Sequence, residues 1–291
     1  MCEYEETQIR LKENRIKASV LFFGSARAKD REGWELKVAE AEAEVEAATD
    51  DESRKAAEKN LTKWKKCEWM GEAAEKVSKL AELVTRWSVS RRCVLGREHS
   101  FHGVTRYHQM RKSKSAMQEP ETDYESGPGS NQYLMVCTGG GPGFMEAANK
   151  GASRVKGARN MGMGITLPFE EGLNEYVTDE LAFEFHYFFT RKFWMLYHCQ
   201  ALIVAPGGFG TLDELFEVLT LKQTGKVQKN LPVILFGKDY WQTVVNWQAL
   251  VDFGTIAQDD VDALFFTDDP QEAFPQYLSK TFRRQSAVGN G

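Results

Sequence analysis

A glycine-rich corner between a strand and a helix constrains the fold of this chain more than any other feature. The corner is Pro206–Glu214, with the sequence PGGFGTLDE, and it follows the apolar run Ala201–Ala205, which is typical of a buried strand. Large apolar residues then recur at helical spacing: Leu212, Leu215, Phe216 and Leu219. Glycines at such a corner let backbone N–H groups approach a ligand, and the positive end of the helix dipole faces the same space. The corner therefore predicts an anion site that suits a phosphate.

Two side chains of this corner carry further chemistry. Thr211 can add a hydroxyl donor to the phosphate cradle. Glu214, one turn into the helix, places a carboxylate beside an otherwise electropositive pocket. Because a carboxylate repels phosphate, we expect Glu214 to address a different part of the substrate.

Three other segments accompany this corner. A second glycine corner at 138–146, TGGGPGFME, follows the apolar run Tyr133–Cys137 in the same way. The segment Glu184–Lys192, EFHYFFTRK, supplies two cations one helix before the strand that leads to the first corner. Lys17–Ser25 is typical of a first strand that runs into a glycine turn, which would place Ser25 and Arg27 over the ligand crevice. The residues of the second corner predicted to contact the ligand are Gly139, Gly140 and Gly141.

Together these motifs resemble the LONELY GUY (LOG) family of cytokinin riboside 5′-monophosphate phosphoribohydrolases, also labelled lysine decarboxylase-like. The resemblance covers about Ser19–Gly24 and nearly everything from Tyr133 to about Leu235. It implies that Arg191 and Glu214 are catalytic, and it matches Glu170 to a substrate contact. The other substrate-binding positions that it implies are Lys192, Gly207, Gly208, Phe209, Gly210, Thr211 and Thr220.

Composition limits the class of protein. A chain of 291 residues can bury a core without disulfides or metals, and we expect one Rossmann-like nucleotide-binding domain over residues 1–291. A net charge of -5 argues against a general nucleic-acid binder. The five cysteines are scattered, without a CxxC pair, which favours a reduced intracellular setting. The N-terminus is too charged for a signal peptide, and no apolar run reaches the roughly 18 residues of a membrane span. We therefore predict a cytoplasmic protein without nucleic-acid or membrane partners.

The order of patterns predicts an α/β fold with a parallel sheet and helices on both faces. A charged segment over about 33–66 predicts a surface helix, and the apolar stripe of 70–87 predicts a helix that packs on the sheet. Residues 91–130 lack periodicity, which predicts a loop insertion. This segment contains three histidines, His99, His102 and His108. No carboxylate or cysteine lies at ligand spacing from them, so no metal site is predicted.

Regular alternation resumes after Thr138. The predicted helices are about 143–156 and 190–200, and the predicted strands are 162–167, 201–205 and 232–236. Strands that alternate with helices form parallel sheets with right-handed crossovers, and ligands lie at the carboxyl ends of the strands. Both glycine corners fall at such ends. His186 alternates with aromatic residues, which fits a polar position on a half-buried segment, and we assign it no catalytic role.

The residues favour a monophosphate over a triphosphate or a dinucleotide. No GK[ST] follows either glycine loop, and Phe144 and Asp213 occupy the third-glycine positions of GxGxxG. Cleavage of an N-glycosidic bond needs a carboxylate near the anomeric carbon and a fixed phosphate, which Glu214 and the first corner can supply. Arg191 can orient the substrate and keep Glu214 ionised. Together with the family resemblance, which implies the substrate and the reaction, we predict an enzyme that releases a free base and ribose 5-phosphate from a cytokinin or purine riboside 5′-monophosphate, without a cofactor.

Other functions and the oligomeric state stay open at this point. A non-catalytic carrier of a nucleotide or of a molybdopterin-type cofactor is the alternative, since fold alone does not fix function. A true lysine decarboxylase is disfavoured, because no lysine motif for pyridoxal phosphate is recognisable. The family resemblance implies a homodimer, and the aromatic content of Phe183–Trp194 favours an exposed apolar face that meets a partner near the site.

Overall fold

The chain is built around one parallel sheet. The computed structural model describes residues 2–90, 132, 134–166, 172–227 and 230–279. In this part of the chain, seven strands pair in the order β4-β3-β2-β1-β5-β6-β7, and every neighbouring pair is parallel. The strands are β1 Ser19–Phe23, β2 Met135–Thr138, β3 Asn160–Ile165, β4 Ala182–Phe185, β5 Cys199–Val204, β6 Val233–Phe236 and β7 Leu264–Thr267. The predicted α/β fold class is confirmed.

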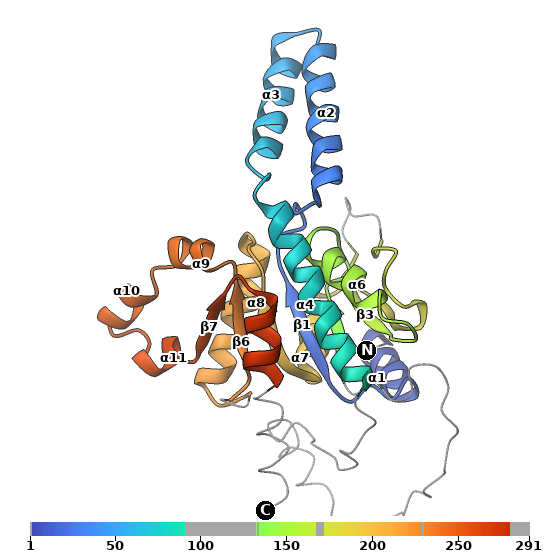
Figure 1. Cartoon of the computed structure of the whole chain (residues 1–291), viewed down its shortest axis with the longest axis vertical. Coiled ribbons are helices and arrows are strands. Elements are labelled where there is room, and N and C mark those ends of the chain that lie inside the picture. The colour runs from blue at the N-terminus through green and yellow to red at the C-terminus, as the bar shows by residue number, and fades with distance from the viewer. Residues whose placement is uncertain (1, 91–131, 133, 167–171, 228–229, 280–291) are drawn as a thin grey trace, which may run out of the picture.

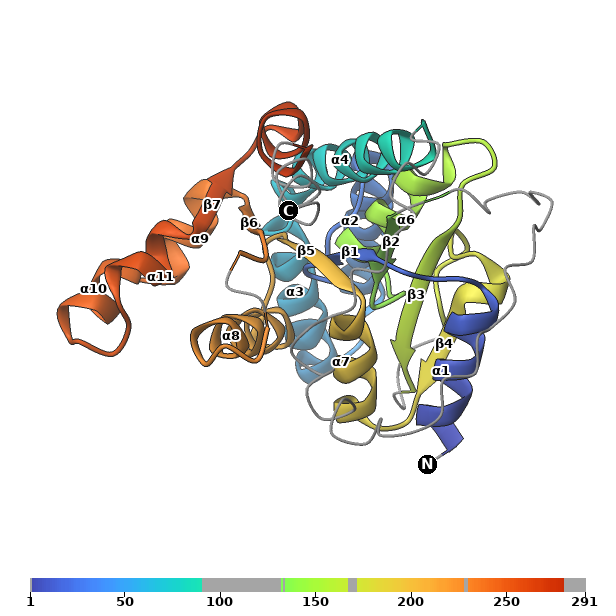
Figure 2. The same ribbon diagram turned by 90° about the horizontal axis from the view of Figure 1, so that it is seen from below.

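Helices cover both faces of the sheet (Figures 1 and 2). Alternate residues of β1 point to opposite faces, as the pleat of a strand requires. Leu21 and Phe23 belong to one apolar core, and Val20 and Phe22 belong to the other. The first core is closed by α7 (Phe188–Tyr197) and α8 (Phe209–Gln223), and the second by α4 (Met70–Ser90) and α6 (Phe144–Ser153). A strand that is buried on both faces explains why β1 is apolar throughout.

The remaining elements lie at the two ends of the sheet. Helix α1 (Cys2–Glu13) lies beside the edge strand β4, which Figure 2 shows from below. The last part of the chain surrounds β7 with short helices: α9 Lys238–Val244, α10 Trp247–Asp252, α11 Gln258–Asp262 and η2 Glu272–Leu278. A further short turn, η1 (Asp179–Leu181), leads into β4. No described helix is both long enough and apolar enough to cross a membrane.

The charged segment at 33–66 forms a helical hairpin and not one helix, so that prediction was wrong in its detail. Helices α2 (Arg31–Ala47) and α3 (Asp51–Lys65) pack against each other and extend away from the sheet (Figure 1). The break comes at Asp50, whose carboxylate accepts N–H bonds from Glu52 and Ser53 and so starts a new helix. Within the two helices only Ala41 and Ala57 are buried, which agrees with a largely solvated hairpin.

Several boundaries differ from the predictions. The helix expected over 190–200 begins at Phe188 and ends at Tyr197, because Cys199 already pairs with Ser19 of β1. The helix expected over 143–156 ends at Ser153. Strand β4 and helix α1 were not predicted at all. The insertion predicted at 91–130, its histidines and Glu170 lie outside the described residues.

Candidate active site

Three loops meet at the carboxyl edge of the sheet, after β1, β2 and β5. Ser25, which follows β1, joins the other two loops through its backbone. Its N–H donates to Pro206 O at 2.8 Å, and its carbonyl accepts from the N–H of Phe144 at 3.1 Å. The Ser25 hydroxyl also accepts from the N–H of Arg27 at 3.1 Å. The two glycine corners that the sequence singles out are therefore neighbours, at the edge where parallel sheets bind ligands.

The first glycine corner leaves open space above the start of α8. Gly208 is the N-cap of α8, and no side-chain hydrogen bond caps the helix there, so its first amides are free of a capping group. A Cβ atom added at Gly208 or at Gly210 would meet no described atom within 4 Å. Protein packing therefore does not require glycine at these two positions, and the open space would let an anion approach the amides. Thr211 is buried beneath the loop, and Phe209 is 92% exposed above it.

The back of this loop is held by Tyr240 from α9. The Tyr240 hydroxyl donates to Gly207 O at 2.7 Å, and the Tyr240 ring stacks on Trp69 at 5.8 Å between centroids. A cleft of about 460 Å³ lies on this far side of the loop, lined by both aromatic rings. Arg191 and Glu214 do not line this cleft, which is thus separate from the predicted site.

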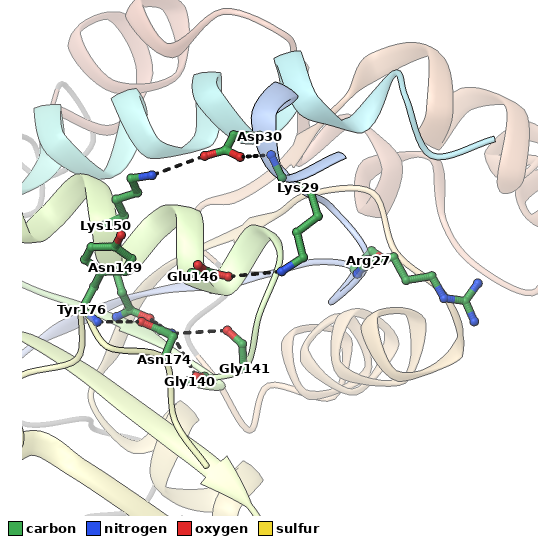
Figure 3. A network of polar contacts seen from close by, with 12 residues as sticks. Arg27, Lys29, Asp30, Gly140, Gly141, Glu146, Asn149, Lys150, Asn174 and Tyr176 are labelled. Carbon is green, nitrogen blue, oxygen red and sulfur yellow. Dashed lines mark hydrogen bonds and ion pairs between the residues drawn. The ribbon is translucent and has the colours of Figure 1, made fainter. Parts of the chain in front are cut away.

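A buried polar network shapes the second glycine corner (Figure 3). The Thr138 hydroxyl accepts from Gly140 N–H at 2.8 Å and donates to Asn149 Oδ1 at 2.7 Å. Asn174 Nδ2 donates to Gly140 O at 2.9 Å and to Asn149 Oδ1 at 3.0 Å. Gly140 has φ +72°, a left-handed conformation that other residues rarely adopt. Sequence reasoning missed both asparagines, although Asn149 is a polar residue on the apolar face of its helix.

Arg191 and Glu214 meet where the two corners approach each other. Arg191 Nη1 lies 3.3 Å from Glu214 Oε1, and Arg191 Nε donates to Met163 O at 2.7 Å. The second corner packs directly on this pair, because a Cβ atom at Gly139 would overlap Nη2 of Arg191. The two side chains are only 9% and 14% exposed. A buried, hydrogen-bonded ion pair therefore lies between the two predicted phosphate loops.

Burial raises the pKa of Glu214 to about 7, although the charges of Arg191 and Lys192 oppose this rise. The expectation that Arg191 keeps Glu214 ionised needs correction on this point, because desolvation outweighs the attraction. The carboxyl group consequently gains or loses its proton near neutral pH. Perturbed carboxyl groups of this kind are typical of acid–base chemistry.

The two remaining predicted contacts, Lys192 and Thr220, are held by residues of α8. The Lys192 ammonium pairs with Asp213 Oδ2 at 2.6 Å and with Glu217 Oε2 at 3.0 Å. Thr220 is exposed, and its hydroxyl donates to Phe216 O at 2.7 Å. Thr220 lies about 14 Å along the helix axis from Thr211, since each residue adds about 1.5 Å. The structure thus brings together Arg191, Glu214 and both glycine corners, but not Thr220.

Aromatic side chains gather at the start of α7, one turn before Arg191. Tyr187, Phe188 and Phe189 are all exposed, and Phe189 is 70% exposed. His186 is exposed as well and directly follows the buried Phe185. Single exposed aromatics are ordinary, but three in a row mark a surface that can meet another molecule.

Comparison with known proteins finds one family model that matches part of the chain. Residues 145–277 match the model of a family described as "Possible lysine decarboxylase". The match confirms the resemblance to the LOG, or lysine decarboxylase-like, family. The matched segment includes Arg191, Glu214 and the whole first glycine corner, whereas Gly139 to Gly141 precede it. No curated protein matches the chain.

A solved structure similar to this chain is "the molybdenum cofactor binding protein from the phototrophic bacterium Rippkaea orientalis". The two share 17% sequence identity over 72% of this chain and 87% of that chain, with a TM-score of 0.37. A likeness at this level says nothing about the ligand of the present chain.

Among the described residues, no group of three or more His, Cys, Asp or Glu side chains could hold a metal ion.

Proposed function

We propose that the protein is a nucleoside 5′-monophosphate phosphoribohydrolase. It would hydrolyse the N-glycosidic bond of a cytokinin or purine riboside 5′-monophosphate and release the free base and ribose 5-phosphate. The observation that carries this proposal is the buried Arg191–Glu214 pair at 3.3 Å, enclosed by two glycine corners. A carrier needs the glycine corners but has no use for a buried carboxyl group with a pKa of about 7.

The distance between the first glycine corner and Glu214 suits one substrate whose phosphate binds at the corner and whose sugar lies beside Glu214. The amides at the start of α8 would bind the phosphate, helped by the helix dipole. Glu214 lies five residues after Phe209, which is about 7.5 Å along the helix axis. This axial distance is comparable to the length of a ribose 5-phosphate, so a phosphate held at the loop would leave the sugar beside the carboxylate.

Glu214 supports the chemistry in its ionised form. As the bond between C1′ and the base nitrogen breaks, its electron pair leaves with the base, which gains a proton. Positive charge then develops on the ribosyl ring, and a carboxylate stabilises that charge or takes a proton from the attacking water. The water oxygen forms the new bond to C1′, which completes ribose 5-phosphate. Arg191 holds the carboxylate in place from one side and packs on Gly139 from the other.

A second copy of the chain is the partner we propose. The exposed Tyr187, Phe188 and Phe189 precede Arg191 by one turn, so a copy packed there would exclude water from the site. A cytoplasmic location is part of the same proposal, as expected for an enzyme of nucleotide metabolism.

Substrate comparison tests the proposed function. The protein is incubated with AMP, isopentenyladenosine monophosphate and the two matching nucleosides, and released base is measured by chromatography. We expect release from the monophosphates only, because a nucleoside cannot use the phosphate loop for positioning. Equal rates with adenosine and AMP would contradict the proposal. A nucleotide that stays bound and intact for hours would indicate a carrier instead.

A further inference from the structure

The N-terminal helix α1 contacts the strand and the helix that lead to Arg191. At one end of α1, Arg10 Nη2 donates to Ala182 O at 2.9 Å and to Glu180 O at 3.1 Å. The Arg10 guanidinium also lies 4.3 Å from the centroid of the Phe183 ring. These contacts fix α1 along the edge strand β4, as Figure 2 shows. The edge strand is thus covered by the N-terminal helix, which is far from it in sequence.

The other end of α1 reaches the first turn of α7. The Glu3 carboxylate accepts hydrogen bonds from His186 N–H and from the Thr190 hydroxyl, the latter at 2.9 Å. Tyr4 packs its ring on Trp194, with centroids 4.9 Å apart. Tyr187, the N-cap residue of α7, makes no side-chain capping bond. Glu3 therefore supplies, from a remote segment, the negative charge that stabilises a helix N-terminus.

We propose that Glu3 is a positioning residue for Arg191, and that Glu3, Tyr4 and Arg10 form an N-terminal clasp on the candidate site. Thr190, which Glu3 binds, directly precedes Arg191 in the same turn. The Arg191 side chain makes three contacts at once. It donates a hydrogen bond to Met163 O, forms an ion pair with Glu214 and packs against Gly139. A small displacement of the first turn of α7 would move the guanidinium away from them, and sub-ångström placement matters in such a site. This proposal rests on the proposed function.

Loss of the clasp and general destabilisation of the fold should change the pH dependence of the reaction rate in different ways. The charged groups that face Glu214 are Arg191 and Lys192 from α7, and Asp213 and Glu217 from its own helix. Among these groups, Arg191 lowers the pKa of Glu214 most strongly against the effect of burial. When Arg191 is less well held, the pKa of Glu214 should rise further. The acid limb of the pH–rate profile should then move to higher pH, whereas partial unfolding would lower the rate equally at all pH values.

Glu3→Gln tests the proposal, with Glu5→Gln as the matched control on an exposed position of the same helix. Arg10 and Tyr4 keep α1 docked in both variants, so both should melt within about 4 °C of the wild type. In Glu3→Gln we expect kcat for AMP to fall about threefold to tenfold, and the midpoint of the acid limb to rise by about half a pH unit. An unchanged midpoint would overturn the proposal.

Hydrogen exchange gives a second measurement that does not depend on activity. Peptides that cover 186–192 should exchange about fivefold faster in Glu3→Gln than in the wild type or in Glu5→Gln. Equal exchange in the two variants would overturn the clasp. If the wild type cleaves no nucleoside monophosphate, the proposed function fails, and the exchange measurement still decides whether Glu3 holds the first turn of α7.

Discussion

Glu214 is the residue on which the proposed reaction depends most directly. We expect Glu214→Gln to lower kcat for AMP hydrolysis by about two orders of magnitude or more, because it removes a positioned charge-stabilising group. Since the ionised form is the active one and the pKa is about 7, the wild-type rate should rise as pH increases from 6 to 8. Steady-state rates over this range check both points, and binding of ribose 5-phosphate to the variant is the control. Near-wild-type hydrolysis by the variant would remove Glu214 from the mechanism.

The raised pKa of Glu214 also links stability to pH. Its folded pKa of about 7 lies above the ordinary value of 4.5, so folding favours the protonated carboxyl group. The contribution of this group is fully present below pH 4.5 and is lost as pH rises through 7. Glu214→Gln does not titrate, so its stability relative to wild type should be about 2 kcal/mol more favourable at pH 8 than at pH 5. Urea unfolding at both pH values measures this difference, and a difference that is the same at both would contradict the burial argument.

A substitution at Gly210 should affect ligand binding without disturbing protein packing. A Cβ atom at this position meets no described atom within 4 Å, so Gly210→Ala should keep the fold and stabilise α8 by up to about 1 kcal/mol. The same methyl group would occupy space that the phosphate needs, so we expect KM for AMP to rise about tenfold with an unchanged kcat. Steady-state kinetics and a melting curve test both statements. An unchanged KM would show that the phosphate does not approach this turn.

At the scale of elements, α9 supports the phosphate loop from behind. Tyr240→Phe removes the hydrogen bond to Gly207 O but keeps the ring on Trp69. We expect a loss of about 1 kcal/mol in the free energy of unfolding and a rise of about threefold in KM for AMP, because the loop is less well held. Thr243→Val, on the exposed side of α9, is the control. A variant that binds AMP as well as the control does would indicate that the loop is held without Tyr240.

Elements with a strong local signal were predictable from the sequence. The strand that precedes Pro206 and the helix that follows it are set by an apolar run, by glycines and by a helical repeat, all within twenty residues. Strand β4 was missed because its four residues, AFEF, carry too short a pattern, and its place at the edge depends on β3 and α1. The break at Asp50 was missed because the helical residues on both sides hide a capping motif of a few residues.

The candidate site was predictable only where a motif marks the residues. Gly208 and Gly210 have open space around them, so packing does not explain their identity, and the sequence motif alone predicts them as ligand contacts. Asn149 and Asn174 act on the site through Gly140, and no motif marks a contact between residues that far apart in sequence. The raised pKa of Glu214 depends on burial by several elements, which sequence spacing cannot convey.

At the scale of the whole molecule, we expect a dimer. Light scattering at micromolar concentration should give about twice the 33.0 kDa of one chain, because the exposed aromatics of α7 favour a second copy. Phe189→Ser should shift the protein toward the single chain, and Leu36→Ser, an exposed position on the hairpin, is the control. A single-chain mass from a preparation that still hydrolyses AMP would show that activity needs no interface.

The hairpin of α2 and α3 determines how this mass has to be measured. The hairpin is closed at its base, where Trp34 Nε1 donates to Trp64 O at 2.8 Å, and from there it extends away from the sheet (Figure 1). An arm of this kind adds much hydrodynamic drag for little mass. A single chain would therefore leave a gel-filtration column earlier than a sphere of the same mass and could pass for a dimer, whereas scattered intensity and sedimentation equilibrium respond to mass and not to shape.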